Sequence, residues 1–128
     1  MAKRILNIVS SAWRATLEEQ DDTIVWLTHA MRGAEAQVAV LLAENAVGYA
    51  ARAQDASGLA FGARKQTNPP RLADDLAKLA GKQVRVYYVG EDAAERGIDA
   101  GELIDGVEPV ERAKLPRLFA EFDQVLRW

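Results

Sequence analysis

The sequence predicts a single-domain, three-layer α/β/α protein, in which helices cover both faces of a mainly parallel sheet of about five strands. Short apolar runs at Arg4–Ser10, Gln37–Leu42 and Gln83–Val89 have the composition of strands that are buried on both faces. Segments with helical periodicity separate these runs, so the strands need crossover connections and are expected to be parallel. A chain of 128 residues is long enough for one domain, which we expect to span residues 1–128.

The first predicted helix begins near Asp22, after a polar and irregular segment. Ile24, Leu27 and Met31 follow one another at steps of three and four residues, which is the period of one helix face. Gly33 is expected to end this helix, because glycine readily adopts the left-handed conformation found after helix C-termini.

The second predicted helix follows the second strand. Its alanine-rich segment, Ala43–Ala53, is typical of a helix, and Gly48 is the weakest position in it. The longest loop comes next, at residues 55–70, where glycines, polar residues and two prolines show no sustained period. A loop of this length inside one domain suggests a functional flap rather than a linker.

The second half of the chain repeats the alternation. Pro69 and Pro70 can start a helix that Gly81 ends, and the third strand then precedes a short acidic helix at Glu91–Arg96. After a VEPV segment, a last helix is expected at Leu115–Phe122, followed by the terminal segment QVLRW. The apolar side chains of this last helix are compatible with packing within the subunit and between subunits, and packing into the core is the favoured interpretation.

Charge and composition exclude several classes of function. The 16 Lys and Arg residues against 19 Asp and Glu residues give a net charge of -3, which does not favour binding to nucleic acid or to an anionic membrane. There is no cysteine, so disulfides, Cys-ligated zinc and thiolate catalysis by this chain are excluded. The N-terminus has no signal-peptide pattern and no apolar run could span a bilayer, so a cytoplasmic location is expected.

A ligand site is expected where the predicted strands end. Ligands of open parallel sheets bind beyond the carboxyl ends of the strands, where loops and helix starts converge. The residues that end or follow the three strands, together with one cation of the long loop, are therefore the candidate ligand-binding residues: Ser10, Ser11, Glu44, Asn45, Val89, Gly90, Glu91, Asp92 and Arg64.

Each of these residues also has an ordinary structural interpretation. Glu91 and Asp92 begin a helix, where carboxylates commonly cap free N–H groups, and capping is the favoured interpretation for both. Glu44 and Asn45 are equally compatible with a cap and with a site, as is Ser10. Arg64 and its neighbouring lysine are more often solvated than bound to an anion.

No catalytic or metal-binding motif is present. His29, the single histidine, has no serine or carboxylate at a recognisable spacing, so a structural role is favoured over catalysis. No metal and no cofactor are expected, because the chain lacks spaced ligands and both glycine-rich nucleotide fingerprints. Trp13, Trp26 and Trp128 are expected in the core or at a subunit contact.

Several segments together resemble the DsrE-like (DsrE/DsrF/TusD) sulfur-relay family. They are VRVYYVGEDAAERGI at residues 84–98, the following LIDGVEPV, and the closing LPRLFAEFDQVLRW. The opening KRILNIVSS and the later LLAENAVGYA keep the same order, so the resemblance covers nearly the whole chain. Its best single motif is a strand followed by a short helix that ends in Arg96-Gly97.

The resemblance implies a fold, an assembly and a missing nucleophile. It implies a DsrE-like α/β domain that forms a homo-oligomer, a trimer or hexamer, and that can meet a sulfur-relay protein partner. Active relay members carry a persulfide on a cysteine at the end of the third strand, a position that corresponds here to about Val89. The resemblance thus implies a cysteine-less binding or accessory protein linked to sulfur metabolism.

Two alternatives remain open. A pocket under the loop at residues 55–68 could bind a small anionic or nucleotide-like ligand through Ser10, Asn45, Arg64 and the helix start at Glu91, although Glu91 would oppose an anion. The second alternative is a hydrolase or lyase with Glu44, Glu91 or Asp92 as general base. Such a base needs a raised pKa in a dry pocket.

Overall fold

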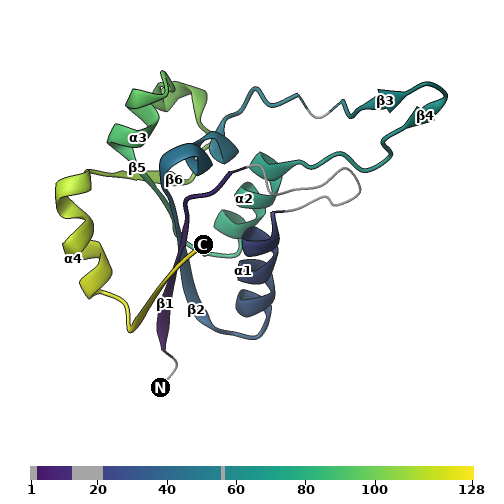
Figure 1. Ribbon diagram of the computed structural model, residues 1–128. Coiled ribbons are helices and arrows are strands. Elements are labelled where there is room, and N and C mark those ends of the chain that lie inside the picture. The colour runs from purple at the N-terminus through teal and green to yellow at the C-terminus, as the bar shows by residue number, and fades with distance from the viewer. Residues whose placement is uncertain (1–2, 13–21, 56) are drawn as a thin grey trace.

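A five-stranded sheet forms the centre of the computed structural model, which describes residues 3–12, 22–55 and 57–128 (Figure 1). The strand order is β6-β5-β2-β1-β7, and every neighbouring pair is parallel. The α/β class and the parallel sheet are therefore confirmed. The strands are β1 (Arg4–Val9), β2 (Gln37–Leu42), β5 (Val86–Val89), β6 (Val107–Val110) and β7 (Gln124–Arg127).

Two helices cover one face of the sheet. They are α1 (Thr23–Gly33) and α2 (Leu72–Gly81), which lie on the same side of the strands in Figure 1. Val9, Val40 and Val86 point toward them from the three central strands and are fully or almost fully buried. Continuous apolar strands pack in this way because both of their faces are covered.

The short helix α4 (Leu115–Ala120) lies on the opposite face, so the three-layer arrangement is confirmed (Figure 1). Leu118 is buried there in a second core cluster that includes Leu6, Leu41 and Val89. Leu115, Phe119 and Phe122 pack against the same cluster and are half-buried. The predicted core role of the last helix is therefore confirmed.

The predicted helix at Ala43–Ala53 is shorter and tighter than expected. It is a 3-10 helix, η1 (Glu44–Ala50), and Glu44 enters it with a φ of 52°. The side-chain amide of Gln54 donates to the carbonyl oxygens of Gly48 (3.1 Å) and Tyr49 (2.7 Å). These bonds satisfy the last carbonyl groups, and so the chain leaves the helix before residue 53.

The long loop contains a hairpin that the sequence did not predict. Its strands are β3 (Ala60–Phe61) and β4 (Arg64–Lys65), and Gly62 turns between them with a φ of 61°. Figure 1 shows this hairpin projecting away from the sheet and its helices. The arm, by which we mean residues 57–67, has no apolar period because almost all of its side chains are exposed.

Two late segments become the edge strands of the sheet. VEPV forms β6, where an edge position tolerates Pro109, which has no N–H for a further strand. QVLRW forms β7 beside β1, although its side chains are exposed. The remaining elements are α3 (Gly90–Glu95) and the 3-10 helices η2 (Ala100–Glu102) and η3 (Arg112–Lys114).

The tryptophans do not occupy the core. Trp26 is 56% exposed and Trp128 is 40% exposed, so core packing is wrong for these two, while Trp13 lies outside the described residues. His29 is half-buried and links α1 to α2, because its Nε2 lies 3.0 Å from the Asp75 carbonyl oxygen. Over the described ranges, no helix has the length and apolarity needed to cross a membrane.

Candidate functional site

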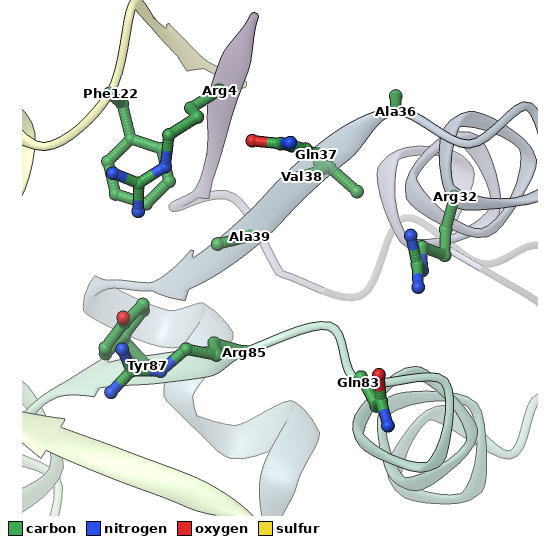
Figure 2. Close-up of a pocket in the computed structure, with 10 residues that line it drawn as sticks. All are labelled: Arg4, Arg32, Ala36, Gln37, Val38, Ala39, Gln83, Arg85, Tyr87 and Phe122. Carbon is green, nitrogen blue, oxygen red and sulfur yellow. The ribbon is translucent and has the colours of Figure 1, made fainter. Parts of the chain in front are cut away.

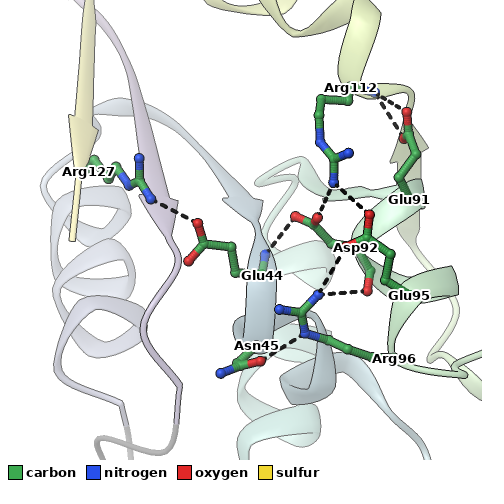
Figure 3. A network of polar contacts seen from close by, with 8 residues as sticks. All are labelled: Glu44, Asn45, Glu91, Asp92, Glu95, Arg96, Arg112 and Arg127. Atoms are coloured by element: carbon green, nitrogen blue, oxygen red, sulfur yellow. Dashed lines mark hydrogen bonds and ion pairs between the residues drawn. The ribbon is translucent and has the colours of Figure 1, made fainter.

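The carboxyl ends of the parallel strands bring distant polar residues together at one edge of the sheet. Glu44 and Asn45 follow β2, Glu91 and Asp92 follow β5, and Arg112 follows β6. Figure 3 shows that ion pairs and hydrogen bonds, several of them to backbone N–H groups, join these residues into one connected group, which we call the strand-end network. Its members are Glu44, Asn45, Glu91, Asp92, Glu95, Arg96, Arg112 and Arg127.

Asp92 lies at the centre of the strand-end network. Its residue exposure is 6%, and its Oδ2 accepts a 2.7 Å hydrogen bond from the backbone N–H of Glu44. Its Oδ1 accepts a hydrogen bond from Nη2 of Arg112, with which it forms an ion pair. One carboxylate therefore ties the segment after β2 to the segment after β6.

Glu91 holds the backbone of Arg112. Both carboxylate oxygens lie 3.0 Å from the Arg112 backbone nitrogen, whose N–H donates to them at the start of η3. This hydrogen bond favours the ionised form and lowers the pKa of Glu91. A general base needs the opposite shift, so the geometry disfavours this role for Glu91.

The capping interpretation of Glu91 and Asp92 is wrong for their own helix. No side chain caps α3, whose N-cap is Val89. Instead, the two carboxylates accept hydrogen bonds from N–H groups at the starts of two different helices, the 3-10 helices η1 and η3. Capping is thus supplied across the fold rather than within one helix.

Arg127 joins Glu44 to Ser10. Its Nη2 lies 3.0 Å from Oε1 of Glu44, and its Nε lies 3.4 Å from Oγ of Ser10. The Ser10 hydroxyl in turn donates to the carbonyl oxygen of Trp128 at 3.0 Å. Ser10 is thus connected to the strand-end network through β7.

Arg96 connects Asn45 to α3. Its Nε donates to Oδ1 of Asn45 at 2.8 Å, and its Nη1 donates to the carbonyl oxygen of Asp92 at 3.1 Å. Arg96 is part of the Arg-Gly motif on which the family resemblance rests. Its contacts give that motif a structural role in fixing the segment after β2.

The other candidate residues lie apart from these contacts. Ser11 is exposed, and Arg64 is on β4 of the arm, which Figure 1 shows projecting away from the sheet. Val89 is 1% exposed in the core cluster under α4. Gly90 borders an open cavity beside α4 that is also lined by Tyr87 and Lys114.

Sequence reasoning missed the arginines that complete the network. Arg112 lies 20 residues from Asp92, and Arg127 lies 83 residues from Glu44. No local spacing predicts such partners, since the sheet alone brings them together. The available signal was a basic residue at or just after the end of each edge strand, but it could only be used once VEPV and QVLRW were recognised as strands.

The arrangement neutralises its own charges. Asp92 and Glu44 each pair with an arginine, and the N–H groups at two helix starts are satisfied by carboxylates. Within the ranges that the structure describes, no three His, Cys, Asp or Glu side chains gather closely enough to hold a metal ion. The chemistry of the site is therefore that of a closed, hydrogen-bonded strand edge.

Two solved structures share this fold over nearly the full length of the chain. The YchN protein from E. coli has a TM-score of 0.77 and 23% sequence identity, covering 98% of this chain and 99% of that one. MTH1491 from Methanobacterium thermoautotrophicum, a protein of unknown function, has a TM-score of 0.59 and 16% identity with the same coverage. At these identities the likeness establishes the fold, and the DsrE-like fold that the resemblance implied is confirmed. No protein-family model and no curated protein sequence matches the chain.

Proposed function

We propose that this chain is a non-catalytic DsrE-like binding or accessory protein linked to sulfur metabolism, which works as a homo-oligomer of three or six copies. The observation that carries the proposal is the residue at the end of β5. Active relay proteins of this type have a cysteine at about this position, whereas here the residue is Val89 and no neighbouring residue supplies a thiol.

The chemistry at this position supports a role without sulfur transfer. The chain has no cysteine, so it cannot form the thiolate that would carry a persulfide. Val89 is also buried, in a cluster with Leu41 and Leu118. The position thus contributes apolar packing where a relay protein needs an accessible sulfur atom.

The strand-end network supports the same conclusion. A transfer site needs room for an incoming group, but here the ion pairs of Asp92 with Arg112 and of Glu44 with Arg127 span the strand ends. These contacts hold the edge together with the chain's own side chains. A structural subunit needs such an edge, whereas a transfer enzyme must keep it open.

Exposed apolar side chains supply surfaces for assembly. Leu59 is 51% exposed and Phe61 is 66% exposed on the projecting arm. Val125 and Leu126 are each 38% exposed on the edge strand β7. Edge strands and apolar projections are ordinary sites of contact between chains, and a second copy of this chain is the occupant that we propose.

Native mass spectrometry of the purified protein tests the assembly. We expect a trimer or hexamer at micromolar concentration, and a shift toward smaller species in a Leu59→Ser, Phe61→Ser double variant. Arg64→Ser, which changes a polar side chain of the same arm, is the matched control and should keep the assembly. A monomeric wild-type protein would contradict the oligomeric part of the proposal.

The link to sulfur metabolism needs a separate measurement. The purified chain should gain no sulfur when it is incubated with a sulfane-sulfur donor, as read by intact-protein mass. Added to a cysteine-bearing DsrE-like protein, it should form mixed oligomers and change the rate of sulfur transfer. An unchanged rate and the absence of mixed oligomers would contradict an accessory role.

A further inference from the structure

An open cavity lies at the amino-terminal ends of the strands, remote from the strand-end network. Its volume is about 200 Å³. This is smaller than the roughly 300 to 1,000 Å³ typical of sites for drug-sized ligands. The cavity is therefore suited to a small ion or a single functional group.

The floor of the cavity is made by a small side chain. Leu6 pairs with Ala39 across β1 and β2, and the register of β2 with β5 brings Arg85 next to Ala39 on the other side. Ala39 is nearly buried, and its methyl group stands between larger side chains on the same sheet face. Ala39 is one of the residues that line the cavity, and its small side chain leaves space there.

Two arginine–aromatic pairs flank this floor. Cζ of Arg4 lies 5.2 Å from the centroid of the Phe122 ring, and Cζ of Arg85 lies 5.0 Å from that of Tyr87. Figure 2 shows the two pairs on either side of Ala39. A guanidinium stacked on a ring is held in place while its N–H groups stay available at its edge.

The charges around the cavity favour an anion. Arg4, Arg32 and Arg85 line it, and none of its lining residues is acidic, although the whole chain has a net charge of -3. Within the described residues, Arg4 and Arg32 form no ion pair, and Nε of Arg32 donates to the Lys82 carbonyl oxygen at 3.1 Å. Two guanidinium groups thus retain donors without a carboxylate partner.

Three nearby carboxylates, Glu108, Glu121 and Asp123, only partly balance these cations. Glu108 accepts two hydrogen bonds from the Arg85 side chain, at 3.1 and 3.0 Å. These bonds raise the pKa of Arg85. Asp123 accepts from the backbone N–H of Arg4 at 2.7 Å rather than from its side chain. Burial raises the pKa of Tyr87, so its neutral hydroxyl group remains a hydrogen-bond donor.

We propose that this cavity binds a tetrahedral oxyanion: a phosphate or sulfate group, either free or carried as a monoester. Arg4 and Arg32 supply the uncompensated charge, and Gln37 and Tyr87 are neutral donors in the lining. Guanidinium groups match such oxyanions because two parallel N–H groups can bind two oxygens. The site is independent of the proposed accessory function.

Titration with inorganic phosphate tests this site. The ¹H–¹⁵N spectrum, including the arginine Nε–H signals, is recorded at constant ionic strength, with sodium chloride replaced by phosphate. We expect saturable shifts at Arg4, Arg32 and Ala39. An Arg4→Gln, Arg32→Gln double variant should bind at least about tenfold more weakly, since each charged hydrogen bond contributes substantially. Methyl phosphate, titrated in parallel, should bind more tightly than phosphate if the natural group is an ester, and more weakly if it is a free ion.

Two further variants separate the cavity from general charge effects. Arg52→Gln removes the same charge at an exposed ion pair with Asp105 and should leave phosphate affinity unchanged. Ala39→Leu fills the floor without changing charge and should abolish binding, with its thermal unfolding showing that the fold is kept. Absence of saturable binding of both anions, or equal affinity in the double variant and Arg52→Gln, would overturn the proposal.

Discussion

At the residue scale, one buried carboxylate organises the edge of the sheet where a ligand site was expected. Asp92 is buried and accepts hydrogen bonds from two segments that lie 48 and 20 residues away in the chain. A buried carboxylate is stable only when hydrogen bonds and an opposite charge compensate its lost hydration. Here Glu44 N–H and Arg112 supply both, and a structural role explains Asp92 without a ligand.

Asp92→Ala should lower the free energy of unfolding by about 2 kcal/mol. The Glu44 N–H loses its acceptor, and Arg112, which is half-exposed, loses its partner. Asp105→Ala is the control, because its pair with Arg52 is exposed and should contribute less than about 1 kcal/mol. Urea denaturation measures both variants, and equal losses would contradict the central position of Asp92.

Glu91 gives the same edge a pH dependence. Its pKa in the folded protein is lowered by the Arg112 backbone N–H, so ionised Glu91 stabilises the fold above its ordinary pKa of 4.5. This contribution should be lost as the pH falls below 4.5 and through the folded-state pKa. Melting temperatures of wild-type protein and Glu91→Gln should therefore differ at neutral pH and converge in acid, whereas a constant difference would contradict the bond.

At the element scale, α1 and η1 are joined through a capping residue. Oδ1 of Asp22 accepts from the backbone N–H of Ile24 at 2.8 Å and from that of Val25 at 3.3 Å. Oδ2 of the same carboxylate accepts the hydroxyl proton of Tyr49 at 2.7 Å. The start of the helix is therefore fixed to the segment that follows β2.

Replacing Asp22 by alanine should destabilise the protein by about 3 kcal/mol. The change removes an N-cap, which contributes about 1 kcal/mol, and the partner of a buried tyrosine hydroxyl. Asp22→Asn keeps the capping oxygen and should cost less, while Tyr49→Phe measures the second contact alone. Thermal unfolding would contradict this assignment if Asp22→Ala and Asp22→Asn were equally stable.

The elements that could be predicted from sequence are those whose side chains are buried. β1, β2 and β5 were recognisable because both of their faces are covered by helices, which selects continuous apolar runs. β7 was not, because all four of its residues are exposed and only its backbone pairing with β1 makes it a strand. The hairpin of the arm was not recognisable for the same reason, because its residues are exposed and only the backbone pairing of β3 with β4 makes them strands.

The candidate site was predictable to a similar extent. The rule that ligands approach the carboxyl ends of strands correctly grouped Ser10, Glu44, Asn45, Glu91 and Asp92 at one edge. The rule says nothing about which charges meet there, because Arg112 and Arg127 come from the two edge strands and their flanks. Without the strand order, the network could not be told apart from a set of separate helix caps.

At the scale of the whole molecule, the two ends of the sheet differ in their chemistry. The carboxyl end is closed by ion pairs between the chain's own residues, whereas a cavity at the amino end is lined by Arg4 and Arg32, which form no ion pair within the described residues. The chain has a DsrE-like fold, and Val89, the last residue of β5, is part of its core. The fold by itself therefore does not determine the chemistry.

Introducing a cysteine at position 89 should not create a reactive thiol. Val89 is 1% exposed beneath α4, and burial in apolar surroundings raises the pKa of a thiol and limits access to it. Val89→Cys should react with a thiol reagent at least about 100-fold more slowly in the folded protein than in urea, because reaction requires local opening. Ser11→Cys, at an exposed position two residues beyond β1, should react at the rate of the unfolded chain. If Val89→Cys reacted as fast as Ser11→Cys and accepted sulfur from a donor, the end of β5 would be open, and a single substitution would separate this chain from the relay proteins that it resembles.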